Sequence, residues 1–588
     1  MLNTNDQRLQ SKQKLNEKMR KRFDDPRLFI VLLRFIIPAI FVSFFAALYI
    51  FIDQIMIIKF VVKSDDLNPT SIFDNNYFNF ADSTGSYDYQ NDYLSATKEL
   101  NKTPFTIHDL IRSSISISAP ITVIINALTL LITMGLANQF SKALGSGDER
   151  KIKEVWTTGF TTNLVISILS SIVIVGVAKI WLTSSANGAN AKLNDPNLDL
   201  NSHAAMIIVK FNERFQELQV QNASNYVYVL AGLFTIQTMN QMYFLLNQSE
   251  GRQLFISIIP PLANVVNIVF DYLLIRFTNQ GITAAAYATV IGWTTNYLAY
   301  LIYNIILIKR KETYLVYKGM FRKINFNWNY LYLIFLIGLA SFFRNASLSV
   351  SNAIFQTNLV TVSEKVASDL PPNYYQSLFG SITPISNLML QSVWGLINGG
   401  RTIAGYKFGQ KNYKDITKIY WYVPMIALTY SIIVYCLFIF GLNDIFLQHF
   451  FNIEQGDKLI ASNLILKITL IQAIFIALGM NAQLLFQSTQ RIGLAWISSL
   501  MQGLFTFIPT YFIMYYVSID QNNIYLYIWM QPINGIAAWL CNWIISIPFA
   551  HKYREFISKY DIGLAMQRFI KKAQLKKENK NLNEINNQ

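Results

Sequence analysis

Cysteine is scarce in this sequence of 588 residues. The two cysteines, Cys436 and Cys541, each stand alone inside an apolar run. Two isolated thiols exclude a disulfide-stapled scaffold and a Cys-based zinc site. The four histidines show no metal-ligand spacing, and the chain has no nucleophile triad, phosphate-binding loop or His-Glu-x-x-His motif. These absences disfavour hydrolytic chemistry and ATP-driven transport within the chain, and we expect neither an enzyme nor a bound cofactor.

Charged residues are also few, at 14% of the chain against about 25% in soluble domains. Apolar residues make up 52% and occur in runs near the length of a bilayer crossing. This composition excludes a soluble multidomain enzyme and indicates a membrane protein. The formal net charge of +15 would suggest nucleic acid as a partner in a soluble chain. Here the distribution of the charge explains it better, and no nucleic-acid partner is expected.

The apolar runs predict an all-α membrane protein with twelve transmembrane helices. The first run is too long for the apolar core of a cleavable signal peptide, so the N-terminal segment is expected to be retained. The predicted spans are 28–61, 113–140, 156–181, 223–248, 254–275, 282–308, 326–358, 375–400, 420–443, 459–488, 493–516 and 524–551.

The segments between these spans fall into two sets, one basic and one acidic, that alternate along the chain. Segments assigned to the inside hold 34 Lys and Arg against 14 Asp and Glu, whereas outside segments hold 10 against 18. Because basic residues accumulate in cytoplasmic loops, this contrast places both termini in the cytoplasm of a multi-pass protein of the cell membrane. An odd number of spans would abolish the contrast.

The spans divide the chain into five parts. We expect a cytoplasmic segment 1–27, an N-lobe 28–308, a cytoplasmic linker 309–325, a C-lobe 326–551 and a basic cytoplasmic tail 552–588. The N-lobe contains two long outer loops, 62–112 and 182–222, and the second has the pattern of an amphipathic helix at 204–218. A solvated cover over the outer mouth is the preferred interpretation of both loops.

The two halves of the chain resemble each other. Gly135 and Gly145 in the first half align with Gly399 and Gly409 at a constant offset of 264, and Gln248 aligns with Gln487 at an offset of 239. Six helices of the same orientation in each half predict two bundles related by a pseudo-twofold axis along the membrane normal.

Seven segments, taken in order, resemble the multidrug and toxic compound extrusion (MATE) transporters. Each segment is a weak signal alone, but together they cover most of the chain. The matching segments are Pro38 through Leu48-Tyr49 to Asp53, Gly135 to Gly145 with Gly147-Asp148, Asn267 to Asp271, Ala284 to Thr289, Ile337 to Phe342, Gly405 to Gly409, and Phe486-Gln487 through Gln502-Gly503 to Pro509. The resemblance implies a transporter that works by alternating access between its two lobes.

Only two acidic residues fall within the predicted spans, Asp53 and Asp271. An ionised carboxylate in hydrocarbon is costly, so such residues pair, bind a cation or exchange a proton. Asp271 lies roughly 28 Å along its helix from the inner side, and Asp53 is near the outer end of its own helix. Asn267 lies one turn from Asp271 on the same face, and Thr289 reaches a similar level. The four side chains are expected to converge.

The resemblance assigns a role to this group. In MATE proteins of the DinF-like branch, the matching positions are associated with Na⁺ or H⁺ coupling, which implies that Asp53, Asn267, Asp271 and Thr289 form the ion-coupling site and ligate Na⁺ if sodium is the coupling ion. A hydrogen-bonded helix-packing network is the alternative. The coupling scheme of the NorM branch is not expected, because the spans of the second half contain no Asp or Glu.

Four further residues are candidates for a substrate cavity. Arg344 would favour an anionic or zwitterionic substrate if it faced the cavity, although it could equally be held by carbonyl groups. Tyr49, Asn387 and Gln391 would add polar groups to the lining.

We therefore predict a secondary active antiporter that exports small organic compounds, such as drugs or toxins, in exchange for Na⁺ or H⁺. The expected surroundings are membrane lipid, and the expected oligomeric state is a monomer. A lipid-linked precursor flippase of the same superfamily is the first alternative, and a membrane-embedded lipid-acting enzyme is the second.

Overall fold

The structure is a computed structural model that describes residues 17–18, 20–61, 75–100, 107–189, 202–317, 326–366, 374–450 and 456–551. The described chain is almost entirely helical. The helices of its first half are α2 (Leu28–Phe60), α3 (Leu94–Glu99), α4 (Ile107–Ser146), α5 (Glu149–Ala189), α6 (His203–Gly232), α7 (Phe234–Ser249), α8 (Gln253–Phe277) and α9 (Ile282–Lys309). Those of the second half are α10 (Trp328–Val366), α11 (Tyr374–Gly409), α12 (Tyr413–Leu437), α13 (Asp457–Ser488), α14 (Ile492–Leu500), α15 (Thr506–Asp520) and α16 (Ile524–His551).

Short elements interrupt or connect these helices. Single π-turns η4 (Phe438–Leu442) and η5 (Ile445–Phe450) follow α12, and η6 (Met501–Phe505) joins α14 to α15. A 3-10 turn η1 (Asn75–Phe78), strands β1 (Phe80–Asp82) and β2 (Gly85–Tyr87), and the π-turn η2 (Tyr89–Tyr93) precede α3.

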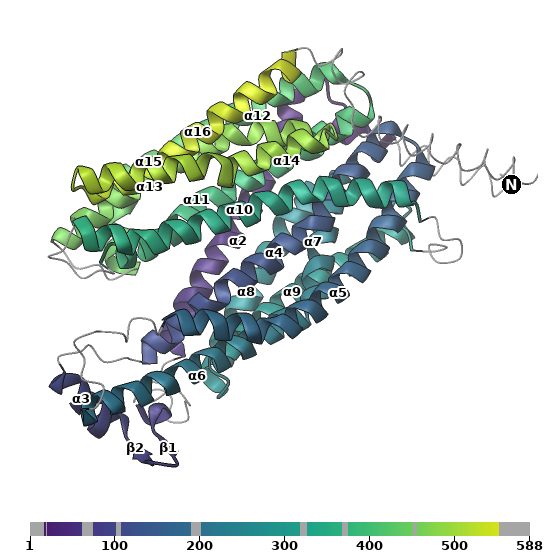
Figure 1. The fold of residues 1–588 in the computed structure, drawn as a ribbon. Helices are drawn as coiled ribbons and strands as arrows, with labels where there is room; N and C mark the ends of the chain where they lie inside the picture. Colours follow the sequence, from purple (N-terminus) through teal and green to yellow (C-terminus); the bar gives the residue numbers. More distant parts are fainter. Residues whose placement is uncertain are drawn as a thin grey trace, which may run out of the picture.

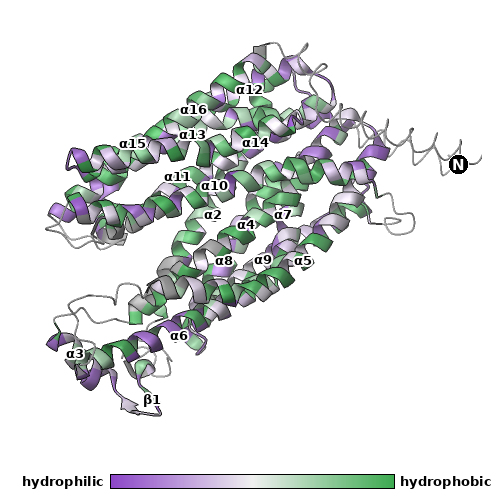
Figure 2. Ribbon diagram, viewed as in Figure 1, coloured by the Kyte–Doolittle hydropathy of each residue, from purple (hydrophilic) through white to green (hydrophobic). Residues whose placement is uncertain are grey.

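Ten of the described helical segments are long and apolar enough to cross a membrane, so the chain is a multi-pass membrane protein. Many large apolar side chains on these helices face outward, among them Leu169 and Ile172 of α5 and Leu254 and Leu262 of α8. Figure 2 shows apolar residues along the lengths of the helices and more polar residues in α3 and α6. In water such a surface would be unfavourable, whereas lipid tails solvate it.

The helices form two groups that meet at one end and diverge toward the other (Figure 1). Helices α10 to α16 make up one group and α4 to α9 the other, with α2 running between them. The groups meet at the end where α2 begins, called here the N-terminal end. The strands β1 and β2 lie at the opposite end, called here the hairpin end.

Close backbone contacts join the groups near the N-terminal end. A Cβ on Gly395 of α11 would collide with the Ala39 carbonyl of α2, and one on Gly338 of α10 would collide with the Leu131 carbonyl of α4. One partner of each contact corresponds under the sequence repeat, since Leu131 lies 264 positions before Gly395, whereas Ala39 and Gly338 are 299 positions apart. Only glycine lets helix backbones approach this closely.

The turns between helices also repeat. Gly147 between α4 and α5 has φ +69°, and Lys411 at the matching position between α11 and α12 has φ +61°. Gly251 and Gln490, which are 239 positions apart, have φ +73° and +60°. The two halves therefore end and restart their helices at corresponding residues, although only one member of each pair is glycine.

A small cap covers the hairpin end of the first group. Strands β1 and β2 pair antiparallel, with Phe80 opposite Tyr87. Lys210 of α6 forms an ion pair with Asp82 at 3.0 Å, and Phe211 packs edge-on against Phe80 at 5.2 Å. The sequence pattern at 204–218 is thus the first half of a longer helix, α6, which continues to Gly232. Helices α4 and α5 extend into the predicted loops, from Ile107 and to Ala189 respectively, and residues 62–74, 101–106 and 190–201 of these loops lie outside the described residues.

Candidate functional site

Helices α2 and α8 lie side by side and bring Asp53 and Asp271 together. The two carboxyl groups are close enough to interact electrostatically. Asp53 is 8% exposed and Asp271 is fully buried. Asp271 lies about 27 Å along α8 from Gln253, its first residue at the N-terminal end. Two carboxyl groups so close together cannot both stay ionised without a positive charge between them.

Most polar atoms around this pair are unsatisfied. Neither oxygen of Asp271 and neither polar atom of the Asn267 amide has a hydrogen-bond partner among the described residues, and the same holds for Oδ1 of Asp53. Gly292 of α9 lets Asn267 lie this close, because a Cβ there would sit 2.9 Å from that of Asn267. Buried polar groups normally find partners, so this cluster has unused capacity for hydrogen bonding or for binding an ion.

Thr289 and two tyrosines complete the surroundings. Thr289 of α9 is buried, and its hydroxyl lies 3.2 Å from the Tyr49 hydroxyl of α2. Tyr226 of α6 lies within electrostatic range of both Asp53 and Asp271. The sequence analysis missed Tyr226, because the aromatic residues of this chain are too numerous for any one of them to stand out.

The cluster offers oxygen atoms from two carboxyls, one amide and one hydroxyl. Oxygen donors of this kind suit a small hard cation such as Na⁺. A proton shared between the carboxyls would also remove the repulsion between them. The residues therefore fit either ion, and the structure brings all four members of the predicted coupling group into one region.

The predicted substrate-cavity residues do not gather in the same way. Arg344 is buried at 3% exposure, donates to Gln483 at 2.9 Å and lies 5.3 Å above the Trp394 ring. Asn387 is exposed on α11, and Gln391 is half-buried one turn further along. Tyr49 belongs to the coupling region described above.

A second buried arginine, Arg401, lies near Arg344. It is 4% exposed on α11 and donates to Gln487 of α13 and to Asn398 of its own helix. Hydropathy ends the eighth predicted span at residue 400, which puts Arg401 in a loop, whereas α11 continues to Gly409. The apolar residues that follow Arg401 in the sequence are the signal that could have extended the span.

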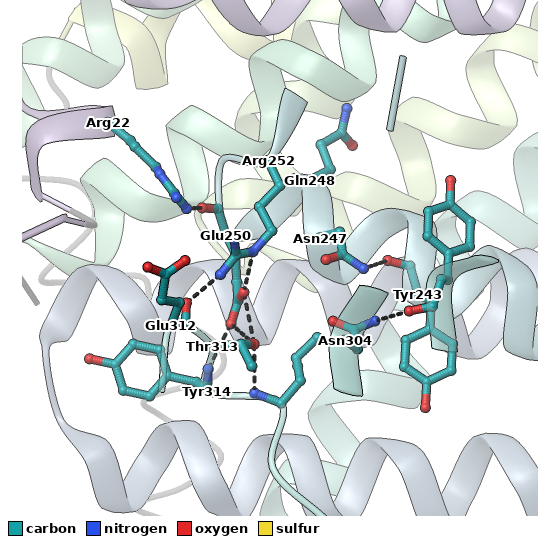
Figure 3. A network of polar contacts seen from close by, with 12 residues as sticks. Arg22, Tyr243, Asn247, Gln248, Glu250, Arg252, Asn304, Glu312, Thr313 and Tyr314 are labelled. Carbon is teal, nitrogen blue, oxygen red and sulfur yellow. Dashed lines mark hydrogen bonds and ion pairs between the residues drawn. The ribbon is translucent and has the colours of Figure 1, made fainter. Parts of the chain in front are cut away.

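A buried carboxylate at the N-terminal end also escaped the sequence analysis. Glu250, fully buried between α7 and α8, pairs with Arg252 at 2.9 Å (Figure 3). Its oxygens accept hydrogen bonds from the Thr313 hydroxyl at 2.8 and 2.9 Å and from the Tyr314 amide at 2.8 Å. Arg22 donates to the Glu250 carbonyl at 2.7 Å. The network ties the N-terminal segment and the chain after α9 to this end of the first group.

The pKa values of two ionisable groups in this network differ from their ordinary values. A hydrogen bond from Lys18 lowers the pKa of Glu312, which forms an ion pair with that lysine at 2.7 Å. Burial lowers the pKa of the Arg22 guanidinium. Both groups stay charged at neutral pH, so the network is held by opposite charges there.

The chain is similar in sequence to three mycoplasma proteins. It is 72% identical over 575 residues to "Uncharacterized protein MG447 homolog MYCGA2290" of Mycoplasmoides gallisepticum, covering 97% of this chain and 98% of that protein. It is 36% identical to "Uncharacterized protein MG447 homolog" of Mycoplasma pneumoniae, covering 92% and 94%, and to "Uncharacterized protein MG447" of Mycoplasma genitalium, covering 93% and 96%. No protein-family model matches the chain.

Solved structures of transporters share the fold. An outward-facing multidrug resistance MATE family transporter of the MOP superfamily superposes with a TM-score of 0.65 at 15% identity, covering 90% of this chain and 96% of that one. A MOP superfamily transporter from Pyrococcus furiosus Vc1, whose title reports reverse polarity of its binding pocket, gives 0.65 at 15%, covering 92% and 98%. The fold of this chain is therefore that of the MATE transporters.

Proposed function

The chain belongs to the MG447 family of mycoplasma proteins, and we propose that it is a secondary active transporter that exports organic compounds in exchange for Na⁺ or H⁺. The observation that carries the proposal is the buried Asp53–Asp271 pair with its unsatisfied neighbours inside a MATE fold. An intramembrane acid pair of this kind is typical of ion-coupled transport.

The proposal includes twelve membrane crossings in two six-helix lobes, 28–308 and 326–551. Beyond the ten apolar segments, α6 with α7 forms one further crossing and α11 the other. Helix α11 is about 54 Å long, enough to span a bilayer, and packs between α2 and α13. The reciprocal glycine contacts and the matching turns support a pseudo-twofold relation between the lobes.

The N-terminal end is proposed to face the cytoplasm of the cell. The basic residues Lys18, Arg22, Lys142 and Lys407 lie there, as the distribution of charge in cytoplasmic loops requires. In this orientation the lobes are closed on the inside and diverge on the outside, and transport requires the opposite arrangement as well.

Helix α2 connects the ion site to the contact between the lobes. Near its outer end Asp53 faces Asp271, and further down Ala39 packs against Gly395 of the other lobe. Pro38, next to this contact, removes one hydrogen bond from the helix interior and so weakens α2 at this place. Binding or release of an ion at Asp53 thereby biases which end of the molecule is closed.

The test is transport by the purified full-length protein in lipid vesicles with an imposed Na⁺ or pH gradient. Gradient-driven movement of an organic probe that requires Asp53 and Asp271 supports the proposal. Transport that depends on neither gradient would favour the second candidate function, a flippase for lipid-linked precursors. The buried guanidinium groups of Arg344 and Arg401 are the observation that supports this candidate.

A further inference from the structure

Two guanidinium groups buried in the C-lobe have no acidic partner in the part of the chain that the structure describes. Arg344 and Arg401 take part in no ion pair formed by the described residues. The two groups lie close enough to repel each other. Burying one charge in a protein costs several kcal/mol unless it is compensated, and two like charges add to that cost. A structural role alone gives no reason for placing them together.

Neutral amides hold the two groups in position without neutralising them. The amide oxygens of Gln483 and Gln487 accept from Arg344 and Arg401, respectively. The amide nitrogens of both glutamines donate to serine hydroxyls, Ser499 at 2.9 Å and Ser341 at 3.3 Å. Nε of Arg344 has no hydrogen-bond partner among the described residues. The guanidinium groups are therefore fixed in place while part of their donor capacity stays unused.

Further hydrogen-bond donors without an acceptor among the described residues lie near Arg401, at the contact between the lobes. A small cavity of about 10 Å³, room for roughly one water molecule, is lined by Arg401 and Asn398 of α11 and by Asn138 and Gln248 of the N-lobe. Nδ2 of Asn138 and Nε2 of Gln248 are buried and have no acceptor among the described residues. Residues with unpartnered donors from the N-lobe and a charged donor from the C-lobe therefore line one cavity.

We propose that the cluster of Arg401, Asn138 and Gln248 recognises an anionic oxygen group of the transported compound, a carboxylate or a phosphate. The charge of the nearby Arg344, which does not line the cavity, adds to the attraction. The inference rests on the proposed transport function and adds the charge of the substrate to it. A planar guanidinium forms paired hydrogen bonds with both groups, and a cationic compound would be repelled.

The position of the cluster indicates at which step of the transport cycle it binds the anionic group. In the present arrangement the cavity is too small for an organic molecule. Separation of the lobes at the N-terminal end would uncover Arg401, which lies about 12 Å along α11 from Gly409 at that end. The anionic group would therefore be bound on the cytoplasmic side, before the lobes close again.

Anion binding by the purified full-length protein tests the proposal without any transport measurement. The thermal midpoint is followed in detergent while inorganic phosphate, or in a parallel series acetate, replaces chloride at constant pH and ionic strength. We expect a saturable rise in the midpoint with at least one of these anions, and the stronger response distinguishes a phosphate from a carboxylate as the recognised group. Arg401→Gln should weaken the apparent affinity at least roughly tenfold, the loss of one charged contact, and Arg344→Gln should weaken it as well.

Matched variants separate binding from folding. Arg150→Gln, at an exposed pair on α5, should respond as the native protein does. Arg401→Lys keeps the charge and should bind more tightly than Arg401→Gln, even if both melt earlier than the native protein. A midpoint that does not change with either anion, or a response that Arg401→Gln leaves intact, overturns the inference. Gradient-driven transport that depends on Asp53 and Asp271 would in that case still support the proposed function.

Discussion

Gly145 of α4 and Gly409 of α11 lie against each other at the N-terminal end. A Cβ on Gly145 would sit 3.1 Å from the Cα of Gly409, and one on Gly409 would sit 2.9 Å from the Cα of Gly145. Each position also faces a backbone carbonyl three residues before the other glycine, Tyr406 for Gly145 and Lys142 for Gly409. Such reciprocity is the property of an interface between two copies of one motif, and here both copies belong to one chain.

This contact predicts the effect of a single methyl group. Gly145→Ala places a Cβ against the Tyr406 carbonyl, so the closed arrangement should lose about 1 to 3 kcal/mol. A lower thermal midpoint of the purified protein is the expected result. Gly176→Ala on α5, where a Cβ would meet no atom within 4 Å, should leave the midpoint unchanged or raise it. Equal midpoints for both variants would contradict the close packing.

The acid pair predicts loss of coupling without loss of fold. Asp53→Asn and Asp271→Asn keep the side-chain shape but can neither exchange a proton nor offer a full negative charge to Na⁺. Gradient-driven transport in vesicles should fall by roughly 100-fold or more. Asp148→Asn, in a surface pair with Lys151, is the control and should transport normally. Native rates in both site variants would end the coupling assignment.

The network around Glu250 predicts a large effect on stability. Glu250→Gln leaves Arg252 buried without its charged partner, and breaking a buried pair in this way costs about 3 to 5 kcal/mol. Thermal melting should show a clear decrease in midpoint. Glu17→Gln breaks an exposed pair with Lys21 and should have no measurable effect. A stable Glu250→Gln protein would mean that the neutral hydrogen bonds alone hold this end together.

The contact between the lobes at the N-terminal end predicts that a covalent cross-link there will stop transport. The Lys142 ammonium of α4 donates to the Gln490 side chain, which lies in the turn after α13. Cysteines at these two positions, with Cys436 and Cys541 replaced by serine, should react together with a short cleavable bifunctional thiol reagent. Transport should stop when they are linked and return after cleavage. Each single cysteine, treated in the same way, should stay active; continued transport by the linked protein would exclude opening at this end.

The turn at Lys411 predicts how substitutions at this position change the stability of the protein. Its φ of +61° lies in the left-handed region, which costs an ordinary residue about 1 to 2 kcal/mol and a β-branched residue more. Lys411→Gly should therefore keep or raise the thermal midpoint, whereas Lys411→Val should lower it. The same ranking is expected at Gln490, the corresponding turn at the other repeat offset. A valine variant as stable as the glycine variant would contradict this turn geometry.

The amino-acid sequence by itself determined the helical class and most helix positions. Long apolar runs are stable in the hydrocarbon of a bilayer, where the backbone must form its hydrogen bonds within the helix. The distribution of apolar residues along the chain is therefore enough to predict the membrane crossings. The predicted span 282–308 differs by one residue from α9, and 524–551 coincides with α16. The sequence also singled out Asp53 and Asp271, because an acid inside an apolar run is conspicuous.

Only the tertiary structure decided which polar residues meet. Glu250 and Arg401 look like ordinary loop residues in the sequence, since burial there depends on helices far away in the chain. Glu250 is enclosed by the segment after α9, and Arg401 by α13 and the N-lobe. Hydropathy measures the local preference of a segment for lipid, whereas burial of a charge inside the protein depends on long-range packing. The proximity of Asp53 and Asp271, and the absence of an acid beside Arg344 and Arg401 among the described residues, follow from that packing.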